Sequence, residues 1–162
     1  MVNIALVGCN GKMGKAVTSA VQSRNDCEIV FGADPFGTPA YDYPVFESLA
    51  VSDKKADVII DFSNPASLDD ILAYALEKKI PCVLCTTGYS PEQVEKIKKA
   101  SESVAVFYSG NMSLGINLLI ELSKEAAKIL GAADFDIEIV EKHHNQKIDA
   151  PSGTALMIAD GI

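Results

Sequence analysis

Short apolar runs alternate with amphipathic or polar segments over the first 108 residues of the chain. Most of these runs are continuously apolar, which is typical of strands buried on both faces of a sheet. The runs are Val2–Val7, Glu28–Ala33, Asp57–Phe62, Pro81–Cys85 and Val104–Tyr108. Strands of this kind, separated by helices, predict an α/β fold in which helices cover both faces of a parallel sheet.

Three segments between these runs carry helix signals. Residues 15–24 continue as a helix after a glycine-rich turn. Ser63-Asn64-Pro65 supplies a cap and an early proline for a helix that runs to Lys79. Ser90 and Gln93 have the spacing of a capping box, which begins a helix through about Ser101. Residues 35–56 contain three prolines, so we expect a loop there with at most a short helix.

The pattern changes after residue 112. Residues 114–130 have the periodicity of a long amphipathic helix, with Gly131 as its expected C′ residue. Phe135–Glu141 then alternates cleanly between apolar and polar side chains, as a strand with one wet face does. We therefore divide the chain into a first domain, residues 1–112, and the start of a second α+β domain with an open mixed or antiparallel sheet, residues 113–162.

The first apolar run leads directly into a glycine loop. Its seven residues are Gly8, Cys9, Asn10, Gly11, Lys12, Met13 and Gly14. Small residues between a strand and a helix let the backbone approach a pyrophosphate at the helix N-terminus. The spacing is G-x-x-G-x-x-G rather than G-x-G-x-x-G, which alone is a weak signal. The loop favours a Rossmann-like, dinucleotide-binding domain over an ordinary tight turn only if an acidic residue stands at the matching distance.

Asp34 stands at that distance. It ends the second strand, 20 residues beyond Gly14, and an acid at this spacing binds the ribose hydroxyls of a dinucleotide. The alternative is that Asp34 is an ordinary turn residue before Pro35.

Ligands of such sheets bind beyond the carboxyl ends of the strands. The later segments there, Thr86-Thr87-Gly88 and residues 109–112, are small or polar as a cofactor cleft requires, although ordinary loops share this composition.

The last fifteen-residue stretch of polar character, Glu141–Ala155, contains both histidines of the chain, His143 and His144. Lys147 follows, and a Pro-Ser-Gly-Thr run leads into a final apolar segment. A histidine exchanges protons near neutral pH, and the first N–H groups of a helix bind anions. The stretch reads equally as a site that protonates or reduces a small carboxylate-bearing molecule and as a strand end followed by a capped helix.

Composition excludes several functions. The net charge of −8 with a single arginine argues against nucleic acid or an anionic membrane as partner. No apolar run approaches the roughly 20 residues of a membrane span, and the N-terminus lacks a basic leader, so we expect a cytoplasmic protein. Cys82 and Cys85 should lie on opposite faces of a strand, so the cysteines are expected to be reduced and no metal site is expected.

With both parts placed, the chain resembles the 4-hydroxy-tetrahydrodipicolinate (dihydrodipicolinate) reductase family over essentially its whole length. The resemblance is carried by the glycine loop, Cys85-Thr86-Thr87-Gly88, Gly110-Asn111-Met112-Ser113 and, above all, Glu141–Ala155. It implies a Rossmann domain, a substrate domain with an open mixed sheet, and a homo-oligomer, usually a tetramer. It also implies reduction of a small dicarboxylate with NADH or NADPH in lysine and diaminopimelate biosynthesis.

The resemblance also implies residue roles. His143 would donate the proton, with Lys147 assisting in substrate binding and protonation. The remaining substrate-binding residues would be His144, Ser152, Gly153 and Thr154. Residues 8–13 would hold the cofactor pyrophosphate and Asp34 the ribose. The nicotinamide end would be held by Cys85, Thr86, Thr87, Ser109, Gly110, Asn111 and Met112.

The chain departs from the family in three ways. Cys85 stands where members commonly have glycine, and Pro35 stands where many have an arginine that favours a 2′-phosphate. Members also continue well beyond Ile162, so we expect either a fragment or an unusually short member. A cofactor-binding module with weak turnover and another Rossmann oxidoreductase acting on a small carboxylate are the alternatives to a working reductase.

Overall fold

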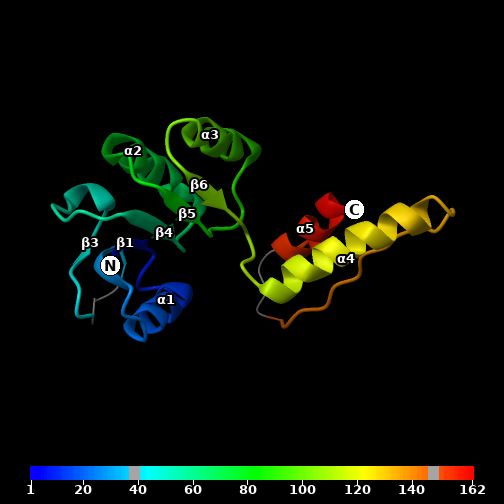
Figure 1. The fold of residues 1–162 in the computed structure, drawn as a ribbon, viewed down its shortest axis with the longest axis horizontal. Helices are drawn as coiled ribbons and strands as arrows, with labels where there is room; N and C mark the ends of the chain where they lie inside the picture. The colour runs from blue at the N-terminus through cyan, green and yellow to red at the C-terminus, as the bar shows by residue number, and fades with distance from the viewer. Residues whose placement is uncertain (37–40, 146–149) are drawn as a thin grey trace. The chain divides into compact units, whose positions relative to one another are not determined.

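The computed structural model describes residues 1–36, 41–145 and 150–162. The chain divides into two compact units, Met1–Ser109 and Gly110–Ile162. The first unit holds the sheet. The second unit is built from two helices and the segment that joins them (Figure 1).

A six-stranded sheet forms the centre of the first unit, with the strand order β3-β2-β1-β4-β5-β6. Every neighbouring pair is parallel. The strands are β1 (Val2–Val7), β2 (Cys27–Ala33), β3 (Val45–Phe46), β4 (Val58–Asp61), β5 (Cys82–Leu84) and β6 (Val106–Tyr108). This is the doubly wound order of a Rossmann sheet, so the predicted fold class is confirmed.

Helices cover both faces of the sheet. α1 (Lys12–Gln22) lies on one side, and α2 (Leu68–Lys78) and α3 (Pro91–Ser101) lie on the other (Figure 1). Each face has its own apolar core. On the α2 and α3 face, Phe31 and Ile59 are fully buried and belong to one cluster with apolar residues of both helices. On the α1 face, Leu6 and Ile29 pack with Val17 and Val21 of the helix.

Local capping sets where the helices begin. Ser90 and Gln93 form the predicted capping box, in which the Ser90 hydroxyl accepts from the Gln93 N–H and the Gln93 side chain accepts from the Ser90 N–H. Asn64 caps a short 3-10 turn, η2 (Pro65–Ser67), which leads into α2. Caps of this kind satisfy N–H groups that have no partner within the helix.

The predicted loop over residues 35–56 contains more order than expected. A second 3-10 turn, η1 (Leu49–Val51), fits the prediction of at most a short helix, but the edge strand β3 was not predicted. β3 pairs with β2 only at Gly32 with Val45 and at Ala33 with Phe46. Two residues are too few for any periodicity to appear in the sequence.

In the second unit, α4 (Leu114–Gly131) lies beside α5 (Gly153–Gly161), as Figure 1 shows. The helix is correctly predicted, but Gly131 is not its C′ residue. α4 includes Gly131 and is capped by Ala132 in a right-handed conformation, while Asp134 has the left-handed φ of 60°. The Phe135 N–H then returns to the Leu130 carbonyl at 3.1 Å.

The strand predicted over Phe135–Glu141 is wrong for the described chain. Residues 135–144 contain no strand, and the described residues of this unit form no antiparallel ladder. A strand exists only when a neighbour pairs with its backbone, which the alternating pattern cannot supply by itself. The side chains of Phe135, Ile137 and Ile139 remain 62, 50 and 40% exposed.

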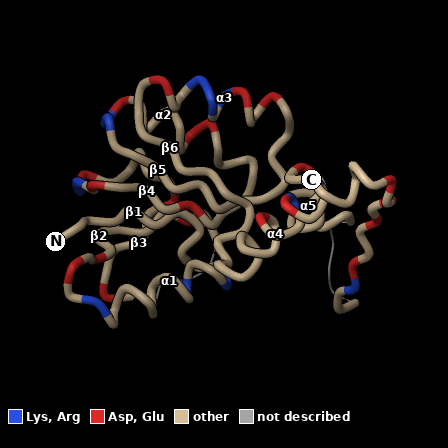
Figure 2. The backbone as a smooth tube through the Cα atoms, turned by 45° about the vertical axis from the view of Figure 1, so that its right-hand side comes forward, with Lys and Arg blue, Asp and Glu red and all other residues tan. Residues whose placement is uncertain are grey.

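Charged residues are dispersed over the surface. Figure 2 shows acidic and basic positions mixed along α2 and α3, where Lys96 pairs with Asp69 at 2.7 Å. None of the described helices combines the length and apolar character that a membrane crossing requires.

Candidate functional site

The register of the sheet brings the ends of five strands to one edge of the first unit. Val7 of β1 lies opposite Ala33 of β2 and Asp61 of β4. Asp61 in turn lies opposite Leu84 of β5, which lies opposite Tyr108 of β6. The residues that follow these strands therefore emerge at the same edge, where parallel sheets bind their ligands.

A cleft of about 520 Å³ opens at this edge. It is lined by the loops after β1, β2 and β4 and by the start of α2. Its lining includes Gly8, Gly11, Asp34, Phe36, Ser63 and Asn64. Three of these are predicted cofactor residues, so the structure brings the glycine loop and the acidic residue into one cavity.

The glycine loop is packed tightly against its surroundings. Gly8 has a φ of 75°, and a Cβ at this position would lie 2.6 Å from the Phe62 carbonyl oxygen. A Cβ on Gly14 would overlap the Gly8 carbonyl oxygen and lie 2.5 Å from Cys9 Cα. Gly11 is the N-cap of α1, and a Cβ there would meet only the Gly8 oxygen, at 3.3 Å. The first and third glycines are thus required by the fold, and Gly11 leaves room for a ligand to approach.

Asp34 is held in place by two backbone hydrogen bonds. Its Oδ2 accepts from the Asn10 N–H and its Oδ1 accepts from the Phe36 N–H, both at 2.9 Å. The Asn10 side chain also donates to the Phe36 carbonyl at 2.5 Å. Each carboxylate oxygen can accept a further hydrogen bond.

Two tyrosines that sequence reasoning missed support the glycine loop. The rings of Tyr41 and Tyr43 stack with centroids 4.8 Å apart. Tyr41 donates to the Cys9 carbonyl at 2.8 Å, and the Tyr43 hydroxyl lies 2.8 Å from the Thr18 hydroxyl of α1. Burial raises the pKa of Tyr43 to about 12, so this hydroxyl is neutral at physiological pH. The sequence feature that could have indicated this role is the occurrence of two tyrosines, two positions apart, in a proline-rich segment.

The Cys9 side chain is buried beneath the loop. Burial, together with the charge of nearby Asp34, raises the pKa of the Cys9 thiol to about 11. The thiol is therefore protonated and faces the sheet, since a Cβ on Gly32 would lie 2.6 Å from its sulfur. Cys9 does not line the cleft and supports the loop from below.

Asp61 forms a second buried network, at the end of β4. It is fully buried and accepts hydrogen bonds from the Ser63 N–H at 2.9 Å, the Ser63 hydroxyl at 2.5 Å and the Tyr89 hydroxyl at 3.2 Å. Burial and the charge of Asp61 raise the pKa of Tyr89. The network ties the loop after β4 to the loop after β5, and the strand pattern around Asp61 gave no sign of it.

The predicted nicotinamide-end residues fall in both units. Cys85, Thr86 and Thr87 follow β5, and Ser109 follows β6 in the first unit. Burial and the charge of Asp61 raise the pKa of Cys85 to about 11. Thr86 is buried in this segment. The other three, Gly110, Asn111 and Met112, belong to the second unit.

The second unit positions the predicted substrate residues around the start of α5. Ser152 is the N-cap, and its hydroxyl accepts from the Ala155 N–H at 3.0 Å. The Ser152 N–H donates to Glu141 Oε1 at 2.8 Å, and Glu141 Oε2 lies 3.4 Å from His143 Nδ1. One carboxylate thus links the histidine segment to the beginning of the helix.

The remaining predicted residues lie close by or outside the described chain. The Thr154 hydroxyl accepts from the Asn111 side chain at 2.9 Å, which joins residues 43 apart in sequence. Gly153 is the first residue of α5. His144 directly follows His143 in a segment without helix or strand. Lys147 lies outside the described residues. The described His, Cys, Asp and Glu side chains form no group that could hold a metal ion.

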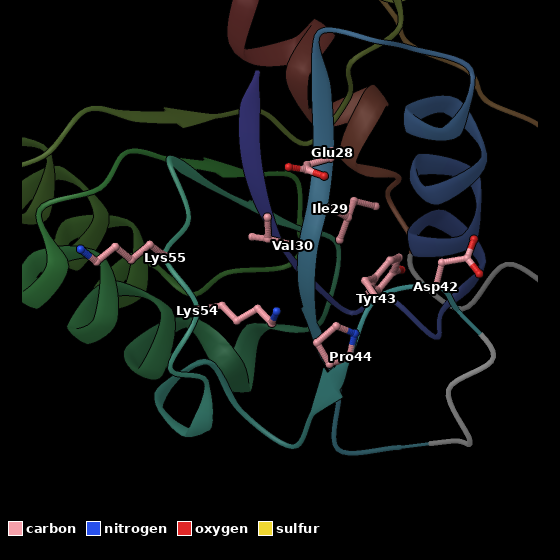
Figure 3. A pocket seen from close by; sticks show the side chains of 8 residues that line it. All are labelled: Glu28, Ile29, Val30, Asp42, Tyr43, Pro44, Lys54 and Lys55. Atoms are coloured by element: carbon pink, nitrogen blue, oxygen red, sulfur yellow. The ribbon is translucent and has the colours of Figure 1, made fainter.

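A second depression, shown in Figure 3, lies in the first unit, and no residue of the glycine loop lines it. It has a volume of about 510 Å³ and lies along the amino-terminal half of β2, where β3 does not pair. Its lining includes Glu28, Asp42, Lys54 and Lys55 but no residue of the glycine loop and not Asp34. It is therefore not the candidate cofactor site.

The sheet order, the glycine loop and the oriented carboxylate define a domain of the Rossmann type. Residues 2–112 match the family described as dihydrodipicolinate reductase, N-terminus, and residues 115–162 match dihydrodipicolinate reductase, C-terminus. The chain therefore belongs to the dihydrodipicolinate reductase family, as its motifs indicated.

Individual relatives give the same family. The whole chain is 53% identical to a 4-hydroxy-tetrahydrodipicolinate reductase of Clostridium tetani, of which it covers 63%. It is 50% identical to the protein of that name from Caldanaerobacter subterraneus, again over the whole chain and 63% of the relative. A dipicolinate-bound dihydrodipicolinate reductase of Paenisporosarcina sp. TG-14 superimposes with a TM-score of 0.78 at 30% identity, over 99% of this chain and 65% of that one. The chain thus spans less than two thirds of the length of these relatives.

Proposed function

We propose that the protein reduces 4-hydroxy-tetrahydrodipicolinate to tetrahydrodipicolinate with NADH or NADPH, in lysine and diaminopimelate biosynthesis. The observation that carries this proposal is the oriented Asp34 carboxylate beside the glycine loop, in a chain that matches reductases of this name from end to end. The reaction is proposed from the names of the relatives, and the cofactor site is proposed from the cleft.

The first domain, proposed as residues 1–112, would bind the cofactor. The backbone of residues 8–13 would hold the pyrophosphate at the start of α1, where N–H groups and the helix dipole favour an anion. Asp34 would accept hydrogen bonds from the adenosine ribose. Cys85, Thr86, Thr87 and residues 109–112 would contact the nicotinamide end. When bound, the reduced nicotinamide supplies a hydride.

The second domain, proposed to begin at residue 113, would bind the dicarboxylate. The first N–H groups of α5, at Gly153 and Thr154, suit a carboxylate because Ser152 caps the N–H of Ala155 instead. His144, Ser152 and Thr154 would add donors. The Paenisporosarcina protein was solved with dipicolinate, a planar dicarboxylate, which supports a ligand of this class.

His143 is proposed as the proton donor. Its Nδ1 lies 3.4 Å from Glu141 Oε2, an arrangement that orients the imidazole and leaves Nε2 for the substrate. Lys147 is proposed to assist in binding and protonation. We further propose that the protein acts in the cytoplasm as a homo-oligomer, and that neither nucleic acid nor a membrane is its partner, in keeping with its net charge of −8.

The test separates cofactor binding from chemistry. Binding of NADH to the 162-residue chain is measured by fluorescence. Cofactor oxidation is followed with freshly generated substrate in the longest form of the protein that its source yields. His143→Ala and Lys147→Ala should each lower turnover by roughly 10²–10⁴-fold, the usual cost of losing a general acid. Both should leave the Kd for NADH nearly unchanged.

Each alternative has its own outcome. Near-normal turnover by His143→Ala would show that the proton comes from another group. Cofactor binding without turnover on this substrate would identify a binding module or a reductase of another small acid, which activity on unrelated keto acids would distinguish. A chain that binds neither NADH nor NADPH would remove the proposal.

A further inference from the structure

Phe36 is an exposed aromatic residue on a fixed backbone. Its side chain is 73% exposed, among the highest values for a large apolar residue of the first unit. Its N–H donates to Asp34 Oδ1 at 2.9 Å and its carbonyl accepts from the Asn10 side chain at 2.5 Å. A single exposed apolar residue needs no explanation by itself, but this one has both backbone groups bound by Asp34 and Asn10.

The position of the Phe36 ring is suited to the adenine base of a dinucleotide. Phe36 lines the 520 Å³ cleft and lies two residues beyond the carboxylate proposed to hold the adenosine ribose. The base attached to that ribose must lie within one sugar of Asp34. The same cleft is also lined by Leu49, Ala66 and Ile71, which offer apolar surface rather than hydrogen-bonding side chains.

We propose that Phe36 is the platform on which the adenine of the cofactor stacks, with Asn10 as the residue that positions it. The inference rests on the proposed cofactor binding and adds a determinant of affinity for the adenosine half. An aromatic ring suits this role because every base has a π-face that can stack on it. Asp34 would hold the sugar, and Phe36 would hold the base.

Three substitutions at Phe36 separate stacking from simple contact. The probe is ADP-ribose, which carries adenine and pyrophosphate without nicotinamide, and its Kd is measured by calorimetry with the 162-residue chain. Phe36→Ala should raise the Kd by about 10-fold, which corresponds to about 1.4 kcal/mol. Phe36→Leu should recover only part of the loss, because it restores apolar area without a ring, and Phe36→Tyr should bind as the wild type does.

A control shows that the effect belongs to this position. Val51 is 63% exposed in η1 and does not line the cleft, so Val51→Ala should leave the Kd unchanged. Thermal melting should be unaffected in all of these variants because both side chains lie largely in solvent. Reduced nicotinamide mononucleotide, which lacks adenine, should bind Phe36→Ala and the wild type equally.

The absence of tryptophan from the sequence provides a direct reporter of stacking. Phe36→Trp places a single indole at the proposed platform, and its fluorescence should be quenched on saturation with ADP-ribose. Val51→Trp should show no quenching under the same conditions. This signal reports contact between base and ring, which a purely structural role of Phe36 would not produce.

The outcomes distinguish the two proposals. If the wild-type chain does not bind ADP-ribose or NADH, the proposed cofactor function fails and this inference fails with it. If the wild type binds ADP-ribose but Phe36→Ala binds equally well and Phe36→Trp is not quenched, the platform is refuted while the cofactor function stands. Selective weakening and quenching would establish it.

Discussion

Replacing Gly14 with alanine should damage the first unit far more than the same change at Gly11. A Cβ on Gly14 would overlap the Gly8 carbonyl oxygen and lie 2.5 Å from Cys9 Cα. Both are backbone atoms of the loop that turns from β1 into α1, so neither can rotate away. A Cβ on Gly11 meets only the Gly8 oxygen, at 3.3 Å, which a small shift can accommodate.

The magnitude is set by how overpacked sites behave. Forcing extra atoms into a packed region costs about 1–3 kcal/mol, and immovable neighbours place Gly14→Ala toward the upper end. At roughly 4–8 °C per kcal/mol for a domain of this size, a loss of about 2–3 kcal/mol lowers Tm by roughly 8–24 °C. Gly11→Ala should lower Tm by no more than about 4 °C, because exchanging glycine for alanine at an N-cap costs about 0.5 kcal/mol.

For cofactor binding we expect the larger effect at Gly11 rather than at Gly14. Below its Tm, Gly11→Ala should bind NADH at least about 10-fold more weakly, since its methyl group occupies the space where a pyrophosphate approaches the backbone. Thermal melts by circular dichroism and NADH titrations on the same preparations give both quantities. Equal Tm values for Gly14→Ala and the wild type would refute the packing argument. Unchanged NADH affinity in Gly11→Ala would refute the assignment of the pyrophosphate site.

Three further predictions concern the same unit. Tyr41→Phe removes the hydrogen bond to the Cys9 carbonyl, so the free energy of unfolding should fall by about 1 kcal/mol and the Kd for NADH should rise about 3- to 5-fold. The control is Tyr74→Phe, in α2 and outside the lining of the cleft, which should leave the Kd unchanged. NADH should bind at least as tightly as NADPH, because Asp34 repels a 2′-phosphate and Pro35 offers no donor; NADPH binding about 10-fold tighter would contradict this. Stability should fall as the pH rises from about 9 toward 11, because the buried Cys82 thiol has its pKa raised from 9.0 to about 11 and the unfolded chain loses that proton first. Thermal melts between these pH values should show a smaller fall in Cys82→Ala.

The parallel sheet and the capping box could be predicted because their determinants are local. Short continuous apolar runs bounded by turn residues favour strands covered on both faces, and the Ser90–Gln93 box depends on two residues three positions apart. The link between the glycine loop and Asp34 was also predictable, because parallel neighbouring strands must end at the same edge. These parts of the candidate site follow from chain order alone.

The contacts that complete the cleft could not be predicted. β3 is two residues long and owes its place to the carbonyl and N–H groups that β2 leaves open. Tyr41 reaches the Cys9 carbonyl across 32 residues of sequence, and Tyr89 reaches Asp61 across 28. Such pairs depend on how the loops fold over the sheet edge. A single sequence shows that the tyrosines are present but not which groups they approach in the folded chain.

The error over Phe135–Glu141 has a different origin. An alternating pattern predicts which face of a strand would be buried, but a strand also needs a neighbouring strand to pair with its N–H and C=O groups. The described residues of the second unit supply two helices and no such neighbour. Consequently α4 has no buried residue, and Leu114, Leu118 and Leu122 are 85, 57 and 60% exposed.

The proposed cofactor residues of the first unit and the proposed substrate residues of the second unit differ in how firmly the chain itself holds them. On the cofactor side, Asp34 cannot turn away from the cleft without giving up hydrogen bonds to both Asn10 and Phe36, so the unliganded chain already presents a fixed carboxylate. Preorganisation of this kind favours binding because little ordering remains to be done. On the substrate side, Glu141 joins His143 to Ser152, but the segment that carries the histidine packs no strand and buries few side chains. A segment with few buried contacts opens at low free energy, so its geometry depends on what binds it. We therefore expect cofactor affinity to depend mainly on the first unit, and substitutions in the segment that carries His143 to leave the Kd for NADH unchanged.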